Sequence, residues 1–135
     1  MAQAVSVHAS FASAHQSGVV APSSLGSDQS RTHAQPIDLV HLSRQTLGDR
    51  DLEQEILALF RSQSQLYLQR LEHSKTRDER KLAAHTILGS ARGIGAWDVA
   101  EIVRHVEDDL DHLSHLDGLI EAVERVNDYI GELLD

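Results

Sequence analysis

The sequence predicts an all-α protein, built as an antiparallel up-and-down four-helix bundle with a short additional helix on its N-terminal side. Three observations predict this class. From Pro36 onward, apolar residues recur at steps of three and four, which is the spacing of one face of an α-helix. The breaks between these amphipathic segments are short, and short connections favour antiparallel neighbours in a bundle. No segment has the pattern of a convincing strand.

Two helices are expected in the first half of the chain. Pro36 suits the first position of a short helix, and Gly48 is a suitable stop for it. The second helix is expected to run from about Asp51 to Glu72 and to be long and amphipathic. Its apolar residues recur at helical spacing: Leu52, Ile56, Leu59, Phe60, Tyr67 and Leu71.

Capping residues mark the start of the third helix. Thr76 and Glu79 have the form of a capping box, so this helix is expected to start near Arg77. Its pattern loses regularity at Gly93-Ile94-Gly95. A fourth helix follows, whose apolar positions are Val99, Ile102, Val103, Val106 and Leu110.

A second capping signal, formed by Ser114 and Asp117, precedes the last helix. The apolar stripe of this helix continues almost to the C-terminus: Leu116, Leu119, Ile120, Val123, Val126, Ile130 and Leu133. The five segments together predict one helical domain over residues 36–135. With 41% apolar but only 4% aromatic residues, its core must consist mostly of aliphatic side chains.

Residues 1–35 are expected to form a flexible, disordered tail, because Ala, Ser, Gln, Gly and His dominate and no periodicity persists. His8, His15 and His33 are irregularly spaced in this tail, so we assign them no role. The chain has no cysteine, which excludes disulfides, thiolate metal sites and cysteine nucleophiles.

The charge distribution excludes further classes. Residues 98–135 carry twelve acidic side chains against only Arg104 and Arg125, and such a surface repels phosphate backbones, so nucleic-acid binding is not expected. No apolar run is long enough to cross a bilayer, and the N-terminus lacks the pattern of a secretory signal. We therefore expect a soluble, cytoplasmic monomer.

The most informative local feature is a histidine in helical sequence with a glycine four residues later. Positions i and i+4 are neighbours on a helix, so Gly89 leaves the ring of His85 unshielded. A glycine inside a helix costs about 1 kcal/mol relative to alanine. Either close approach by another molecule or tight helix packing would explain it.

A helical wheel of the third helix predicts which face His85 occupies. Ala83, Ile87, Ser90 and Ile94 lie opposite and form a small, apolar, core-facing surface. Around His85, on the outer face, the wheel groups Lys81, Leu88, Gly89 and Arg92. His85 is therefore expected to be accessible to solvent, either as a reactive group or as an ordinary exposed histidine.

The run His85-Thr86-Ile87-Leu88-Gly89-Ser90-Ala91, followed by Arg92-Gly93-Ile94-Gly95-Ala96, resembles the signature of histidine-containing phosphotransfer (HPt) domains. The resemblance extends over about residues 37–110 and includes Ile37-Asp38-Leu39, Leu57-Ala58-Leu59-Phe60 and Val106-Glu107. It implies a four-helix bundle whose exposed histidine accepts a phosphoryl group from a receiver-domain aspartate and passes it to another. His85 matches the phosphoacceptor position.

The chemistry of the residues fits this resemblance. Imidazole near neutral pH has an unprotonated nitrogen that can attack phosphorus, and the phosphoramidate formed is reactive enough to donate onward. A hydrogen-bond acceptor at the second nitrogen would fix the tautomer. The resemblance places Glu107, on the fourth helix, against the ring as that acceptor; otherwise Glu107 is a solvated surface residue.

One position departs from the family pattern, which usually has a lysine three residues after the histidine. Here that position holds Leu88. Lys81 and Arg92 flank His85 on the same face, and either is expected to contact phosphate instead, with Arg104 as a third candidate; each could also be a solvated charge. Leu88, with Gly89, could form the apolar centre of a docking surface for receiver domains, or be an isolated surface leucine.

The sequence thus predicts a phosphoryl carrier of a multistep phosphorelay. It holds no P-loop or kinase motif, so the phosphoryl group must come from elsewhere. No cofactor or metal is expected on this chain, and Mg²⁺ would belong to the receiver. Two alternatives stay open: a helical adaptor that binds receivers without phosphate, and a metal-binding bundle that uses His105, His112 and His115 with nearby aspartates.

Overall fold

A computed structural model of the chain describes residues 35–135. Within this range the protein has five helices and no strand: α3 (Leu39–Thr46), α4 (Arg50–His73), α5 (Arg77–Ile94), α6 (Trp97–Glu107) and α7 (Leu116–Leu134). The all-helical class predicted from the sequence is confirmed. The expected tail, with His8, His15 and His33, lies outside the described residues except for its last position.

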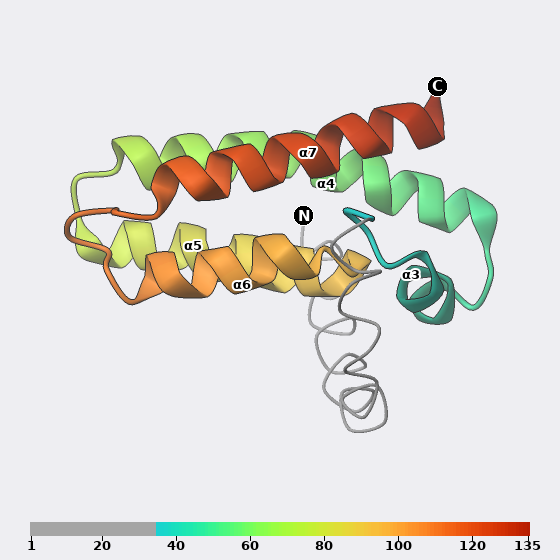
Figure 1. The fold of residues 1–135 in the computed structure, drawn as a ribbon, viewed down its shortest axis with the longest axis horizontal. Coiled ribbons are helices and arrows are strands. Elements are labelled where there is room, and N and C mark those ends of the chain that lie inside the picture. The colour runs from blue at the N-terminus through green and yellow to red at the C-terminus, as the bar shows by residue number, and fades with distance from the viewer. Residues whose placement is uncertain (1–34) are drawn as a thin grey trace.

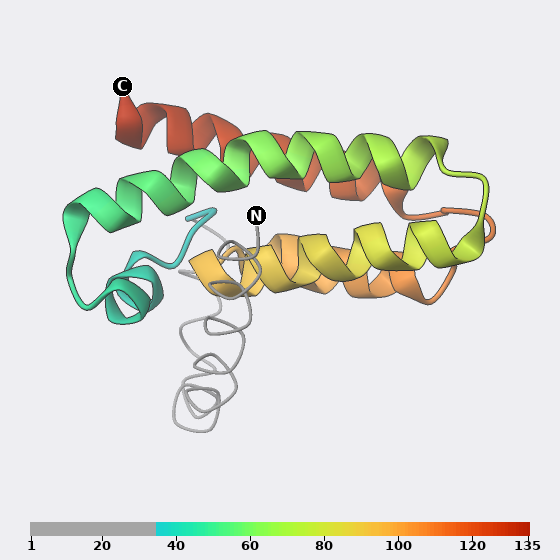
Figure 2. The ribbon, with the colours of Figure 1, turned by 180° about the vertical axis from the view of Figure 1, so that it is seen from behind.

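The four long helices form two layers. One layer holds α4 and α7 and the other holds α5 and α6, with the short α3 at one end (Figure 1; seen from behind in Figure 2). Each of α4 to α7 packs against the next, α7 returns to α4, and α3 contacts α4 and α5. The helix that carries His85, α5, therefore has a neighbour on each side, α4 and α6.

The core between the layers is almost entirely aliphatic, as the composition predicted. Its largest fully buried side chains are Ile37, Leu42, Leu71, Ile87, Ile94, Leu119, Ile130, Val99, Val103, Val106, Val123 and Val126. Among the aromatic residues of the described range, only Phe60 is buried. Full burial of a Val, Leu or Ile side chain contributes roughly 1.5 to 3 kcal/mol. This apolar contact holds the helices in a fixed arrangement.

The start of α5 follows the sequence prediction closely. Thr76 is the N-cap, and its side-chain oxygen accepts a hydrogen bond from the backbone N–H of Glu79 at 3.2 Å. The Thr76 hydroxyl also donates to the Glu79 carboxylate at 2.9 Å. The helix begins at Arg77, as predicted. Because the Thr76 cap fixes this start, it also fixes where His85 lies along α5.

Two other predicted helix starts are wrong. α3 begins at Leu39 rather than Pro36, because the Asp38 carboxylate caps it by accepting from the N–H of His41. α7 has His115 at its N-cap and no side-chain cap. The hydroxyl and the backbone N–H of Ser114 donate instead to Asp109, which removes Ser114 from the capping role.

Asp38 also fastens α3 to the turn between α5 and α6. Its backbone N–H donates to the Gly95 carbonyl at 2.9 Å, and the Trp97 indole N–H donates to its carboxylate at 3.1 Å. Gly95 has φ of 79°, and a Cβ there would lie 2.9 Å from Asp38. Only glycine fits this turn comfortably, so it fixes how α6 returns along α5.

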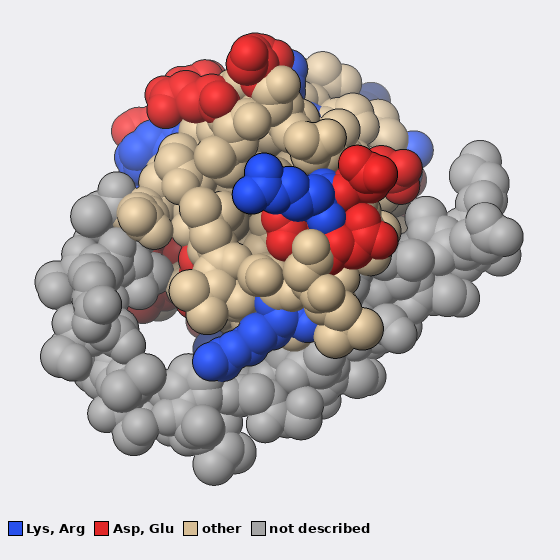
Figure 3. Space-filling view, turned by 90° about the vertical axis from the view of Figure 1, so that its right-hand side faces the viewer, with Lys and Arg blue, Asp and Glu red and all other residues tan. Residues whose placement is uncertain are grey.

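The surface at the α3 end is mixed in character. Acidic and basic side chains stand there among uncharged ones (Figure 3). Exposed apolar side chains of α3 and its C-cap are Leu39, Val40 and Leu47. Among residues 35–135, no helix is long and apolar enough to span a membrane.

Candidate functional site

His85 lies near the middle of α5 with its side chain 75% exposed. The opposite face of the helix is buried through Ala83, Ile87 and Ile94, as the wheel predicted. The structure therefore confirms that this histidine is accessible to another molecule. The imidazole is open to solvent in this arrangement of the helices.

Glu107, the last residue of α6, lies beside the ring. The His85 Nδ1 atom is 3.9 Å from Glu107 Oε2, and the Glu107 side chain is only 25% exposed. This distance is too long for a hydrogen bond but short enough for an ion pair with a protonated ring. Catalytic hydrogen bonds are often long without substrate and tighten in the reacting complex. Of the two nitrogens, Nδ1 faces the carboxylate, which leaves Nε2 as the candidate nucleophile.

Gly89 follows His85 by one turn, and its surroundings decide between the two explanations for it. A Cβ built on Gly89 would meet nothing within 4 Å, apart from atoms of its own helix turn. No neighbouring helix therefore requires a glycine here, and the packing explanation fails. The missing side chain instead leaves open space beside the imidazole.

Leu88 does not lie on the outer face, contrary to the sequence prediction. Its side chain is 6% exposed and belongs to the hydrophobic core. α5 packs against both α4 and α6, so these two helices together cover a wide part of its circumference. Leu88 lies at the edge of the face that the wheel assigned to solvent and falls within the covered part. The proposed role of Leu88 as the exposed centre of a docking surface is therefore wrong.

A different leucine is exposed next to the histidine. Leu82, three residues before His85 on the same face, has 65% of its surface accessible. The sequence analysis missed it, although its i−3 spacing from His85 was a usable signal. An exposed leucine of this kind supplies apolar contact area beside the imidazole.

Of the three basic residues predicted near His85, two share its helix α5 and one lies on α6, one turn before Glu107. Lys81 and Arg104 are exposed and Arg92 is partly buried. Within residues 35–135, none of the three forms an ion pair with a carboxylate.

The structure also reveals a histidine that the sequence analysis missed. The ring of His41 on α3 donates through Nε2 to the carbonyl of Arg92 at 2.9 Å and contacts the edge of Trp97, with ring centres 4.9 Å apart. Burial lowers the pKa of His41, and the Arg92 carbonyl and Asp38 only partly offset this. No local spacing predicts this contact, since it joins residues 51 positions apart.

The histidines considered for metal binding are only partly brought together. His105 and His115 have ring centres 5.5 Å apart, whereas His112 pairs with Asp109 at 3.2 Å. The Ser114 hydroxyl and then His112 hold the pKa of Asp109 below its ordinary value. In the described part of the chain, no group of three or more such residues is placed to hold a metal ion.

Comparison with known proteins agrees with this geometry. The family model described as "Hpt domain" matches residues 55–135, a stretch that contains His85, Gly89 and Glu107. Neither the curated proteins nor the solved structures compared with the chain gave a match. Members of the matched family are phosphoryl carriers rather than kinases and interact with receiver domains of response regulators. Because the match covers more than half of the chain, this protein belongs to the Hpt domain family, whose members transfer phosphoryl groups through a histidine in phosphorelays.

Proposed function

We propose that this chain accepts a phosphoryl group on His85 from the aspartyl phosphate of one receiver domain and passes it to the aspartate of another. The observation that carries this proposal is the exposed imidazole with a carboxylate beside one nitrogen and open space on the same face. The four long helices would act as an antiparallel up-and-down bundle that presents this ring. Mg²⁺ would be held by the receiver.

The transfer step follows from the two ring nitrogens. The Nε2 lone pair of His85 attacks phosphorus, the bond from phosphorus to the aspartate oxygen breaks, and the carboxylate leaves as an anion. Nδ1 keeps its proton, so the ring becomes positively charged. The Nδ1–H group donates a hydrogen bond to the Glu107 carboxylate, which stabilises the positive charge that develops on the ring. Its role is therefore to position and stabilise the ring, without contact to phosphorus.

The phosphoryl oxygens also require positive charge, which the family pattern usually supplies as a lysine. Since Leu88 occupies that position and is buried, Lys81, Arg92 and Arg104 remain the candidates. A receiver would approach over Leu82, because its exposed side chain lies one turn from the reacting ring.

The decisive experiment is incubation with a phosphorylated receiver. Wild-type protein should acquire label that is stable to alkali and lost in acid, as expected of a phosphoramidate, whereas His85→Gln should acquire none. His105→Gln is the matched control, because it removes an exposed histidine from the neighbouring helix. Equal labelling of His85→Gln and wild type would refute the proposal.

The absent lysine favours a second candidate function, that of an adaptor which binds receivers without accepting phosphate. In that case receivers would bind wild type and His85→Gln with the same affinity, and neither would acquire label. Measuring affinity and label transfer in the same samples separates the two functions. Binding with acid-labile label confined to His85 would eliminate the adaptor.

A further inference from the structure

The phosphoryl group on His85 would bring two negative charges to a site whose usual cation is missing. Charge-assisted contacts from arginine or lysine are the ordinary means of holding such oxygens. Three basic residues are near enough in sequence or space to be considered, and the geometry of α5 and α6 distinguishes between them. This inference rests on the proposed function, because it concerns the phosphoryl group at that same histidine.

Arg92 lies one turn beyond Gly89 on α5. Side chains on a helix lean toward its N-terminus, so Arg92 leans back toward the turn that contains Gly89, with no side-chain atom within 4 Å of a Cβ built on Gly89. Nothing from the rest of the protein occupies the space above Gly89. The backbone of Arg92 is held in place, because its carbonyl accepts the hydrogen bond from His41. Arg92 therefore borders the open space from its C-terminal side.

Arg104, the second arginine considered, lies on α6 three residues before Glu107. The turn at Gly95 and Ala96 makes α6 run back along α5, and the contact between His85 and Glu107 fixes the register of the pair. Because the two helices run in opposite directions, a residue three before Glu107 on α6 lies level with the residue three after His85 on α5. Arg104 is therefore level with position 88, where the family pattern has its cation. Its side chain is exposed and forms no ion pair in the part of the chain described.

Lys81 lies on the opposite side of His85. It is one turn nearer the start of α5, and the same N-terminal lean carries its ammonium group away from the ring and from Gly89. Its charge is equal to that of either arginine, and its separation in sequence from His85 is smaller than that of Arg92. Lys81→Ala therefore tests the third candidate, and because it removes one positive charge it also shows how much net charge alone contributes.

We propose that Arg92 and Arg104 together border the open space at Gly89 and hold the phosphoryl oxygens of phosphorylated His85, replacing the single lysine by two arginines from neighbouring helices. As Nε2 attacks and the bond to the leaving group breaks, the two guanidinium groups donate to the equatorial oxygens. Both interactions strengthen as charge develops on those oxygens. Gly89 is required because any side chain there would enter the space that the two arginines share.

The test uses a small phosphoryl donor as well as a receiver, so that phosphate binding is separated from docking. With phosphoramidate, the donor's phosphorus–nitrogen bond breaks, ammonia leaves, and His85 is labelled without a protein partner. Each single variant, Arg92→Ala or Arg104→Ala, should slow labelling by both donors roughly threefold, and the double variant roughly thirtyfold. The double variant exceeds the product of the singles because either guanidinium partly replaces the other.

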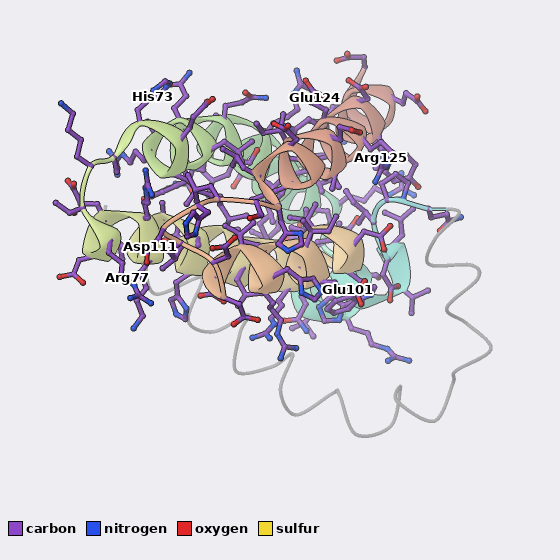
Figure 4. The ribbon with its side chains drawn as sticks, turned by 60° about the vertical axis from the view of Figure 1, so that its left-hand side comes forward. His73, Arg77, Glu101, Asp111, Glu124 and Arg125 are labelled. Carbon is purple, nitrogen blue, oxygen red and sulfur yellow. The ribbon has the colours of Figure 1, made fainter. Side chains whose placement is uncertain are left out.

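One control, one comparison variant and one double lysine variant complete the design. Arg125→Ala, on α7 in the other layer (Figure 4), removes the same charge and should leave both rates unchanged. Lys81→Ala tests the third candidate and should slow labelling less than either arginine variant. The double lysine variant of Arg92 and Arg104 should recover part of the lost rate. Unfolding curves of all variants identify any that fail to fold.

The outcomes are distinct. Slower labelling by the receiver alone would make the arginines docking contacts and overturn the inference, as would unchanged labelling by both donors in the double variant. An equal loss in Lys81→Ala would also overturn it, since general electrostatic attraction would then suffice. In each of these cases label would still be confined to His85. Failure of the proposed function gives a different result, in which His85→Gln acquires as much label as wild type.

Discussion

Replacing Gly89 by alanine should stabilise the protein while it impairs the site. Gly89 lies inside α5, does not adopt a positive φ, and would place a Cβ in open space. The substitution therefore gains the full difference in helix propensity, about 1 kcal/mol, with no steric cost. For a domain of this size, 1 kcal/mol raises Tm by about 4 to 8 °C. The gain is measured by thermal and urea unfolding followed by circular dichroism.

The same substitution should slow transfer from a receiver, and Gly89→Leu should slow it further, because the added atoms enter the space beside His85. Gly118→Ala is the matched control. A Cβ there also meets nothing within 4 Å, but Gly118 lies on α7, so any stabilisation should leave transfer unchanged. A Gly89→Ala protein that is less stable than wild type would refute the description of this space as open. Stabilisation with unchanged transfer would refute its role in the reaction.

Two further predictions concern the leucines beside the histidine and the half-buried histidine of α3. Leu88→Ala should lower the free energy of unfolding by about 2 to 5 kcal/mol, because it leaves a cavity in the core. Leu82→Ala should leave stability unchanged and weaken receiver binding, because Leu82 is exposed. Urea unfolding and binding titrations measure the two effects, and equal losses of stability in the two variants would contradict the prediction. Burial lowers the pKa of His41, so the folded protein binds fewer protons than the unfolded chain, and stability is expected to fall as pH drops below about 6.5. His41→Gln should flatten this dependence between pH 7.5 and 5.5, and an unchanged slope in denaturant unfolding would show that other groups cause it.

The sequence alone predicted those features that depend on neighbours along one helix. The Thr76 cap, the start of α5 and the exposure of His85 all follow from local spacing, and all are observed. The proximity of Glu107 to the ring was implied by family resemblance, and the measured distance agrees with it.

Features that depend on how helices meet could not be predicted in this way. A wheel gives the direction of Leu88 but not the width of the buried arc, which is set by two neighbouring helices. Ser114 satisfies the rule for a cap, yet Asp109 offers its hydroxyl a carboxylate partner and changes its role. His41 and Arg92 meet only because α3 folds back onto the far end of α5.

The attachment of α3 has a consequence for where the functional unit begins. The family match starts at residue 55, inside α4, and leaves out all of α3. Nevertheless, Ile37 and Leu42 are fully buried, and Asp38 anchors the turn that sets α6, and with it Glu107, against His85. The structural unit that holds the site is therefore longer than the range that the family model matches. A truncation at residue 55 would keep His85 but remove Asp38, whose hydrogen bonds to Gly95 and Trp97 hold the start of α6 against α5.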